Sequence, residues 1–350
     1  MKSSQCIRAI LTIAALVGVG TSLLKAEERL YVENTFGGDI TVVDVPRHEV
    51  VGRIEVGKYP DDVVASHDGT VLYANRHQSL GIPGIPRGSE SGELIAISTA
   101  THEILWRIDI DGTPHHLAVS KDDRYVYVPI FNSFLVDVID TRARPAPRRV
   151  ARVPVGYGPH GMKLSADGRR LYVGTMFADQ LTIVDTQSLQ PIQAIPFPEA
   201  VRPFDFTRDE KRAYVQLSRT HGFVVVDLEK GEMVRRVDLP ALPADAELPQ
   251  FFPHTVNHGL ALSPDEKLLF AAGSIANYVC VYTVPELDDV ATIPVGTEPN
   301  WIVFSNDGRY CYVTNRRSDD LSVISVESLK EINRIKMGQY PQRMVTVVVP

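Results

Sequence analysis

Histidine returns at one fixed position of a repeated segment in this 350-residue chain. His115, His160 and His258 each stand five residues before the serine that ends a short apolar stretch. Neutral imidazole nitrogens bind copper, zinc and iron. A zinc site, for instance, requires the ring nitrogens to approach one ion to about 2.0–2.1 Å. We therefore predict a transition-metal or redox site at His115, His160 and His258, with His77, His116 and His254 in reserve.

The other copies of the repeat carry different polar residues at this position. The seven aligned residues are Asp61, His115, His160, Arg202, His258, Asn300 and Gln342, and the residues that follow them include Asp62, His116, Trp301 and Arg343. One alternative to a metal is a small anion or an acidic partner segment, bound by Arg202, Arg343 and partly protonated histidines. Trp301 would then form an apolar wall. In a third interpretation, histidine only fills this turn of the repeat.

Acid–base catalysis without a metal has weaker support. Asp61 and Asp62 lie near His115 and His116 in neighbouring copies, which suggests an acid–base pair. Adjacent aspartates at a turn more commonly accept hydrogen bonds from backbone N–H groups. The sequence contains no serine nucleophile motif, P-loop or G-x-G-x-x-G turn.

The elements that must position these residues are short strands. The aligned positions 258, 300 and 342 are separated by 42 residues, and insertions lengthen three of the other units. Each unit has four segments rich in Val, Ile, Tyr and Leu, separated by turns such as residues 165–170, and this pattern is typical of antiparallel hairpins. The repeat predicts an all-β fold, a seven-bladed β-propeller of four-stranded antiparallel blades.

The first unit is incomplete at its start. Residues 30–34, 39–44 and 50–56 supply three strands of one blade, and residues 343–349 supply the missing innermost strand. Pairing of the N- and C-terminal strands in one blade removes two exposed sheet edges. We therefore expect the ring to close in this way.

The longest insertions fall on the face that carries the histidines. In a propeller, the loop between the second and third strands and the loop into the next blade lie where the innermost strand begins. The insertions occupy such loops, around residues 77–92 and 240–257, and the second contains Phe251, Phe252 and His254. Long loops within a compact repeat are usually functional. This insertion-bearing face is therefore the expected place for a small anionic ligand or a protein partner.

Several segments resemble the YVTN family of β-propeller proteins across residues 27–350. They include YVEN (31–34), YVTN (312–315), LTIVDT (181–186), LSVIS (321–325), ATIPVG (291–296) and residues 156–173. The resemblance implies the propeller fold. Family members include surface-layer and periplasmic proteins, and the scaffold also occurs in propeller subunits of redox enzymes. The resemblance therefore does not indicate which function this chain has.

Residues 1–26 do not belong to the repeat. Lys2 and Arg8 flank the start of an apolar stretch at residues 10–19, and a small residue, Ala26, ends the segment. This pattern predicts a secretory signal peptide, because the stretch is shorter than the roughly 20 residues needed to span a bilayer. The expected mature chain is exported and periplasmic, with secretion or the cell surface as the alternative, and it has no membrane span.

Charge and cysteine content limit the possible partners. The chain has 36 basic and 43 acidic residues, which argues against nucleic acid as a partner. Cys280 and Cys311 lie in apolar strands, where they are either buried thiols or a disulfide. The sequence contains no C-x-x-C-H motif, which excludes covalent c-type haem.

Two function classes follow from the sequence. The first is an exported ligand- or protein-binding module, in one version a cofactor-free subunit of a periplasmic redox complex. The second is a metal-dependent oxidoreductase or lyase that uses the histidines. Convergence of the histidine side chains would separate the two.

Overall fold

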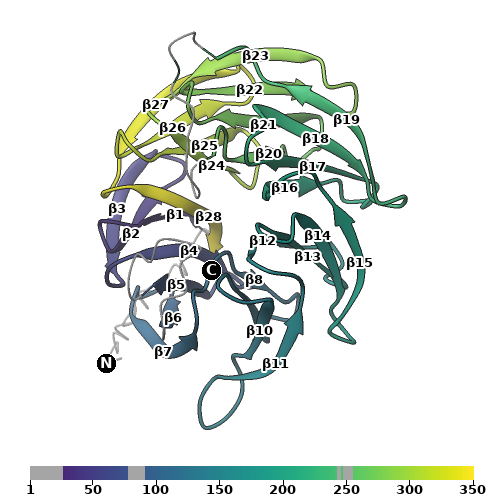
Figure 1. The fold of residues 1–350 in the computed structure, drawn as a ribbon. Coiled ribbons are helices and arrows are strands. Elements are labelled where there is room, and N and C mark those ends of the chain that lie inside the picture. The colour runs from purple at the N-terminus through teal and green to yellow at the C-terminus, as the bar shows by residue number, and fades with distance from the viewer. Residues whose placement is uncertain (1–26, 78–90, 243–245, 247–254) are drawn as a thin grey trace, which may run out of the picture.

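The chain forms a ring of seven four-stranded antiparallel sheets around a central channel (Figure 1). The structure is a computed structural model, and it describes residues 27–77, 91–242, 246 and 255–350. These residues contain no helix. The predicted signal peptide and most of the two long insertions lie outside the described residues.

Each blade runs from an innermost to an outermost strand. Blade 1 consists of β28 (Pro341–Val349), β1 (Glu27–Asn34), β2 (Asp39–Asp44) and β3 (Glu49–Glu55). Blade 2 consists of β4 (Pro60–Ala65), β5 (Val71–His77), β6 (Ser91–Ser98) and β7 (Ile104–Asp111). Blade 3 consists of β8 (Ala118–Val119), β9 (Tyr125–Ile130), β10 (Leu135–Asp140) and β11 (Arg148–Pro154). Blade 4 consists of β12 (Pro159–Leu164), β13 (Arg170–Thr175), β14 (Gln180–Asp185) and β15 (Gln190–Pro196).

The remaining blades follow the same order. Blade 5 consists of β16 (Val201–Phe206), β17 (Arg212–Leu217), β18 (Gly222–Asp227) and β19 (Glu232–Asp238). Blade 6 consists of β20 (Leu260–Leu262), β21 (Leu268–Gly273), β22 (Tyr278–Thr283) and β23 (Asp289–Pro294). Blade 7 consists of β24 (Pro299–Phe304), β25 (Tyr310–Asn315), β26 (Asp320–Ser325) and β27 (Lys330–Lys336). The sequence prediction of seven four-stranded blades is confirmed.

The ring closes in blade 1, as the sequence predicts. Strand β1 pairs antiparallel with β28, from Glu27 opposite Val349 to Asn34 opposite Pro341. The first and last strands therefore lie side by side although they are far apart in the sequence (Figure 1). This pairing covers the inner edge of β1, and β28 becomes the channel-facing strand of the blade.

A hydrogen-bonded turn links the first two strands of each blade from 2 to 7. In blade 2, the Ser66 hydroxyl donates to Asp68 Oδ1 at 2.7 Å and accepts the Val71 N–H at 3.0 Å. Blades 3 to 7 repeat the first of these bonds. Serine, aspartate and glycine favour such turns because their side chains bond locally or permit positive φ. These aspartates are therefore turn residues.

Apolar residues fill the spaces between neighbouring blades. Between blades 4 and 5, for example, the rings of Tyr172 and Phe206 stack with 4.4 Å between their centroids. Cys280 belongs to the core between blades 5 and 6, and Cys311 to the core between blades 6 and 7. Both are free and buried. The disulfide alternative is therefore wrong.

Candidate functional site

The seven aligned residues and the side chains around them form the mouth of the channel, and in five blades a β-bulge lies at the aligned position. In blade 2, Pro60 pairs with Arg76 but Asp62 pairs with Asn75, so Asp61 is an extra residue. Blades 1, 4, 5 and 7 have a register shift at the same place. A bulge re-aims a side chain out of the regular ladder. The bulge therefore gives residues of different types the same position around the channel in these five blades.

At the bulges some backbone N–H groups have no partner in the strand ladder, and side chains from the second strands accept their hydrogen bonds. The N–H of Asp62 donates to Asn75 Oδ1 at 3.0 Å. In the same way, the N–H of Trp301 donates to Thr314 Oγ1 at 3.1 Å, and that of Arg343 to Glu33 Oε2 at 3.3 Å. The second strand therefore anchors the mouth in three blades.

Blade 5 departs from this pattern. The equivalent residue after the bulge is Pro203, which has no N–H, and the equivalent second-strand residue is Gln216. Gln216 is fully buried, and neither atom of its amide has a hydrogen-bond partner among the described residues. A proline in the innermost strand thus leaves a buried amide unsatisfied.

Arg343 holds the centre of the mouth. Its side chain is 2% exposed, its Nη1 lies 2.9 Å from Asp61 Oδ1, and the same nitrogen donates to the Asp61 carbonyl. Its Nε and Nη2 both approach His116 Nε2, at 3.0 and 2.6 Å. Because both groups of Arg343 donate, His116 Nε2 must accept and its proton must lie on Nδ1. Burial, followed by Arg343, lowers the pKa of His116 well below its usual value, so this imidazole is neutral.

The predicted histidines come together in one continuous group of rings. The centroids of His115 and His160 are 4.9 Å apart, those of His116 and His160 4.5 Å, and those of His160 and His258 6.5 Å. Burial is the main cause that lowers the pKa of His160 and of His258 well below the usual value. His116, His160 and His258 are therefore neutral imidazoles, and the positive charge beside them comes from arginines.

One side of the mouth combines a carboxylate with two imidazoles. We call Asp61, His77 and His115 the acidic side. Their potential ligand atoms all lie within 4.8 Å of one another. Burial raises the pKa of Asp61, but Arg343 and His115 outweigh burial and hold that pKa well below the usual value. Asp61 is therefore a carboxylate although it is buried.

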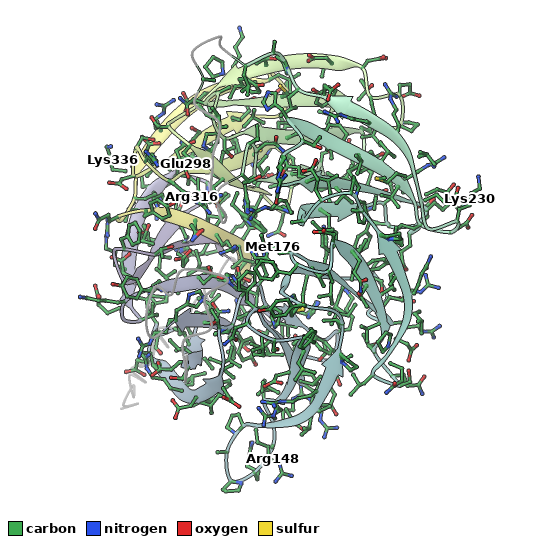
Figure 2. The ribbon with its side chains drawn as sticks, in the orientation of Figure 1. Arg148, Met176, Lys230, Glu298, Arg316 and Lys336 are labelled. Carbon is green, nitrogen blue, oxygen red and sulfur yellow. The ribbon has the colours of Figure 1, made fainter. Side chains whose placement is uncertain are left out.

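The opposite side is positively charged. We call Arg202, His258, Asn300 and Arg316 the basic side. Burial, then Arg316 and Arg343, lower the pKa of Arg202 to about 9, so this guanidinium remains charged at neutral pH. Arg202 donates from Nε to Ser218 Oγ at 2.8 Å, and its Nη1 lies 3.8 Å from Met176 Sδ. Figure 2 shows Met176 near the ring centre and Arg316 toward blade 7.

Two further buried carboxyl groups flank the mouth. Burial, then Asp61, raise the pKa of Glu33 well above its usual value. Burial also raises the pKa of Asp62 to about 7, and Asp62 Oδ2 accepts the Leu117 N–H at 2.6 Å. Asp62 therefore satisfies a backbone N–H, as adjacent aspartates commonly do, while Asp61 alone lies at His115.

Several polar atoms of the mouth are buried without a hydrogen-bond partner among the described residues. They are His160 Nδ1, both side-chain amide atoms of Asn300, and Asp61 Oδ2 and His115 Nδ1, which form an ion pair with each other at 3.0 Å and have no other partner there. Buried polar atoms in proteins are nearly always hydrogen-bonded, and a cluster of exceptions calls for a bound group. All five atoms come from aligned positions of the repeat.

The channel beneath the mouth contains a cavity of about 250 Å³. The innermost strands of several blades line it, with His116 and Trp301 near the mouth and Lys163 ion-paired to Asp205 farther along. Trp301 lies 5.5 Å from the Arg343 guanidinium and 5.0 Å from the His116 ring. Trp301 therefore lines this cavity beside Arg343 and His116.

The geometry adds residues that the sequence did not single out. Glu33 and Asn75 come from second strands, Phe131 packs edge-on against His115 at 4.7 Å, and Arg316 donates to Gln342 Oε1 at 2.6 Å. In the sequence, Glu33 and Asn75 could have been found as the second-strand positions that align with the bulge. Among the described residues, the metal-compatible group contains His115 with Asp61 and His77, whereas His160 and His258 lie outside it. His254 lies outside the described residues.

Comparisons with known proteins agree with the fold. Residues 85–247 match the family model of the YNCE-like β-propeller. No protein of curated function matches significantly. Among solved structures, hydrazine synthase from Kuenenia stuttgartiensis is 21% identical, with 85% of this chain and 92% of that chain covered and a TM-score of 0.68.

Two other solved structures are similar at the level of the fold. The periplasmic gluconolactonase of Pseudomonas aeruginosa is 22% identical, with 93% of this chain and 100% of that chain covered and a TM-score of 0.72. A dihydro-haem d1 dehydrogenase is 14% identical, with 88% of this chain and 63% of that chain covered and a TM-score of 0.62.

None of the described segments forms a helix with the length and hydrophobicity needed to cross a lipid bilayer. The ring of blades confirms the fold that the resemblance implied, and the family match agrees with it: the chain is a seven-bladed β-propeller.

Proposed function

We propose that this propeller is an exported binding protein that takes a small anionic ligand at the basic side of the mouth. The observation that carries the proposal is a set of buried, unsatisfied polar atoms beside three arginines. His160 Nδ1 and the amide of Asn300 have no hydrogen-bond partner among the described residues. Arg202 and Arg343 both act electrostatically on the His160 ring, and Arg316 acts on His258. Guanidinium charge and unsatisfied donors in one place favour an anion.

The charge balance supports an anion over a neutral ligand. Arg343 is neutralised by Asp61, and Arg316 by Glu298 at 3.3 Å. Arg316 and Arg343 are the groups that lower the pKa of Arg202 after burial, so three guanidinium groups act on one another on this side of the mouth. A ligand with one negative charge and several oxygen acceptors suits this environment. The Trp301 ring supplies an apolar contact beside it.

A titration with simple anions tests the proposal. Phosphate, sulfate and citrate serve as probes, and the melting temperature Tm is followed for the wild type, Arg202→Met and Asn300→Leu. We expect at least one anion to raise the Tm of the wild type saturably, because ligands that bind only the folded state stabilise it. Arg202→Met should lose this response.

A matched control separates this site from general charge effects. Arg148 is an exposed arginine at the periphery of blade 3 (Figure 2). Arg148→Met should respond to the anion as the wild type does. An equal response in Arg202→Met, or no response of the wild type to any of the three anions, would contradict the proposal.

Export is part of the proposal and rests on the pattern of residues 1–26. Periplasmic export predicts that the mature protein recovered from a periplasmic extract begins at Glu27. N-terminal sequencing checks this directly. A protein that stays in the cytoplasm with its first 26 residues intact would contradict it.

A second candidate function is a docking subunit of a periplasmic redox complex. The fold similarity to hydrazine synthase favours it, as does the absence of a C-x-x-C-H motif from the sequence. This function predicts that haem- or quinone-bearing proteins co-purify with the untagged chain at fixed stoichiometry. Purification of the chain alone from its native membrane-free extract would argue against it.

A further inference from the structure

We infer that Asp61, His77 and His115 form a binding site for one divalent transition-metal ion, with zinc as the best-fitting occupant. This inference goes beyond the proposed function, because its ligands are Asp61, His77 and His115 and none of them belongs to the basic side. It also replaces His160 and His258 of the sequence prediction by Asp61 and His77.

The distances fit ligands of a single ion. The ligand atoms of the three residues lie within 4.8 Å of one another. His115 Nδ1 and Asp61 Oδ2 form an ion pair at 3.0 Å, and neither atom has another partner among the described residues. Two atoms bound to a tetrahedral ion at about 2.0–2.2 Å stand roughly 3.3 Å from each other. An ion between them would therefore require this pair to separate by only about 0.3 Å.

The other atoms of these side chains are already engaged in ways that orient the ligands. His77 Nε2 lies 2.8 Å from the Pro114 carbonyl. A carbonyl only accepts, so Nε2 carries the proton and Nδ1 keeps its lone pair for a metal. Asp61 Oδ1 is paired with Arg343, which leaves Oδ2 for the ion. Metal-binding histidines and carboxylates usually have such supporting partners.

Strand pairing, hydrogen bonds and ring packing hold the backbone around the three ligands in place. Asp61 sits in the bulge of β4, and His77 ends the neighbouring strand β5. His115 follows the bridge between Pro114 and Ile130, and its carbonyl accepts a hydrogen bond from Asn75 Nδ2. The ring of Phe131 packs edge-on against His115. The site therefore combines three rigid segments from blades 2 and 3.

The donor set selects the class of metal. Two imidazole nitrogens with one carboxylate oxygen favour zinc and neighbouring transition metals over calcium and magnesium, which prefer oxygen ligands. Three protein ligands also leave a coordination position for water or another small ligand. The side chain of His115 is 12% exposed and that of Asp61 8% exposed, so the ion would be shielded by protein on most sides.

A second histidine–aspartate pair in the same chain provides the control. His67 Nδ1 lies 2.9 Å from Asp123 Oδ1 at turns on the opposite face, and the His67 side chain is 39% exposed. This pair has nearly the same spacing as His115 and Asp61 but is not part of a three-ligand group among the described residues. His67→Ala therefore removes a similar pair without touching the proposed site.

Isothermal titration of Zn²⁺ into chelator-treated protein tests the inference. We expect one ion per chain, with affinity lowered by about 100-fold or more in His77→Ala and Asp61→Asn. His67→Ala and His258→Gln should bind zinc like the wild type. Substitution by Co²⁺ should give the visible absorption bands of a four-coordinate centre, and these bands should be lost in His77→Ala.

The outcomes separate this inference from the anion proposal. His77 is at the end of a strand, and circular dichroism of His77→Ala establishes that the variant folds. Zinc bound with equal affinity by His77→Ala, or lost only in His160→Ala and His258→Gln, would overturn the inference. The absence of zinc binding by the wild type would also overturn it, even if phosphate or citrate still raised the Tm through Arg202.

Discussion

The acidic and basic sides of the mouth share one backbone frame and carry opposite chemistry. In blade 2 the bulged position holds Asp61, which meets His77 and His115. In blade 5 the same position holds Arg202, which lies in the field of Arg316. The repeat thus fixes where a side chain enters the mouth but not its charge. A symmetric scaffold can carry an asymmetric site, because function depends on the residues placed on the fold.

Arg343 joins the two sides, and its removal should have the largest effect. Arg343→Met leaves Asp61 as a buried carboxylate without its guanidinium and removes the donors to His116. Loss of one partner of a buried ion pair commonly costs about 3–5 kcal/mol of unfolding free energy. Urea denaturation at pH 7 measures this loss.

The double variant shows whether the charge of Asp61 is the cause. Arg343→Met/Asp61→Asn should recover part of the lost stability, because the buried charge is then gone. A loss below about 1 kcal/mol in Arg343→Met would show that the two sides do not depend on this ion pair.

The next largest effect is expected from Asn75, the second-strand residue behind the acidic side, in contrast to Gln216 behind the basic side. Asn75 accepts from the Asp62 N–H and donates to the His115 carbonyl, so Asn75→Leu should cost about 1–3 kcal/mol by leaving both groups unsatisfied. Gln216 has no such bonds among the described residues. Gln216→Met should therefore leave the unfolding free energy unchanged or raise it.

Denaturation of both variants under one set of conditions makes the comparison. Equal losses in Asn75→Leu and Gln216→Met would contradict the account of blade 5, because Gln216 would then need a partner that the proline bulge does not supply.

The pH dependence of stability tests the environment of the basic side. Burial and three arginines hold the pKa of His258 below its unfolded value, so this histidine stabilises the fold above about pH 6.5. Its contribution is lost as the pH falls below 6.5, because the unfolded chain then binds a proton that the folded chain does not. His258→Gln should flatten the fall in unfolding free energy between pH 6 and 5 by up to about 1.4 kcal/mol per pH unit.

Measurement of the unfolding free energy of wild type and variant at several pH values isolates the contribution of His258. A steeper pH dependence in His258→Gln would mean that His258 is protonated in the folded chain and that the basic side is less positive than we describe.

Glu33 should give the smallest effect. Burial, then Asp61, raise the pKa of Glu33 and so disfavour its charged form, and a glutamine has nearly the same shape and no charge. Glu33→Gln should change the unfolding free energy by less than about 1 kcal/mol at pH 7. Destabilisation by more than about 2 kcal/mol in a urea titration would indicate a charged Glu33 paired with Arg343.

The sequence predicted the fold well because the fold depends on periodic features. The 42-residue spacing, the turn serines and the terminal strands lead directly to seven blades closed in blade 1. The face that carries His115, His160 and His258 also follows from the alignment.

The pairing of side chains within the mouth could not be predicted in the same way. The alignment places residues around a circle, whereas convergence depends on rotamers, on the bulges and on which second-strand residue is nearby. Asp61 meets His77 because the bulge of β4 turns it toward the end of β5. Likewise, the position of the His116 proton follows from Arg343, which is more than two hundred residues away in the sequence.

The most direct test of a divided mouth is a crystal structure grown with Zn²⁺ and phosphate and measured at the zinc absorption edge. The account predicts an anomalous peak about 2.0–2.2 Å from ligand atoms of Asp61, His77 and His115. It also predicts phosphate density beside Arg202 and Asn300. A zinc peak between His160 and His258, or phosphate bound at the acidic side, would contradict it.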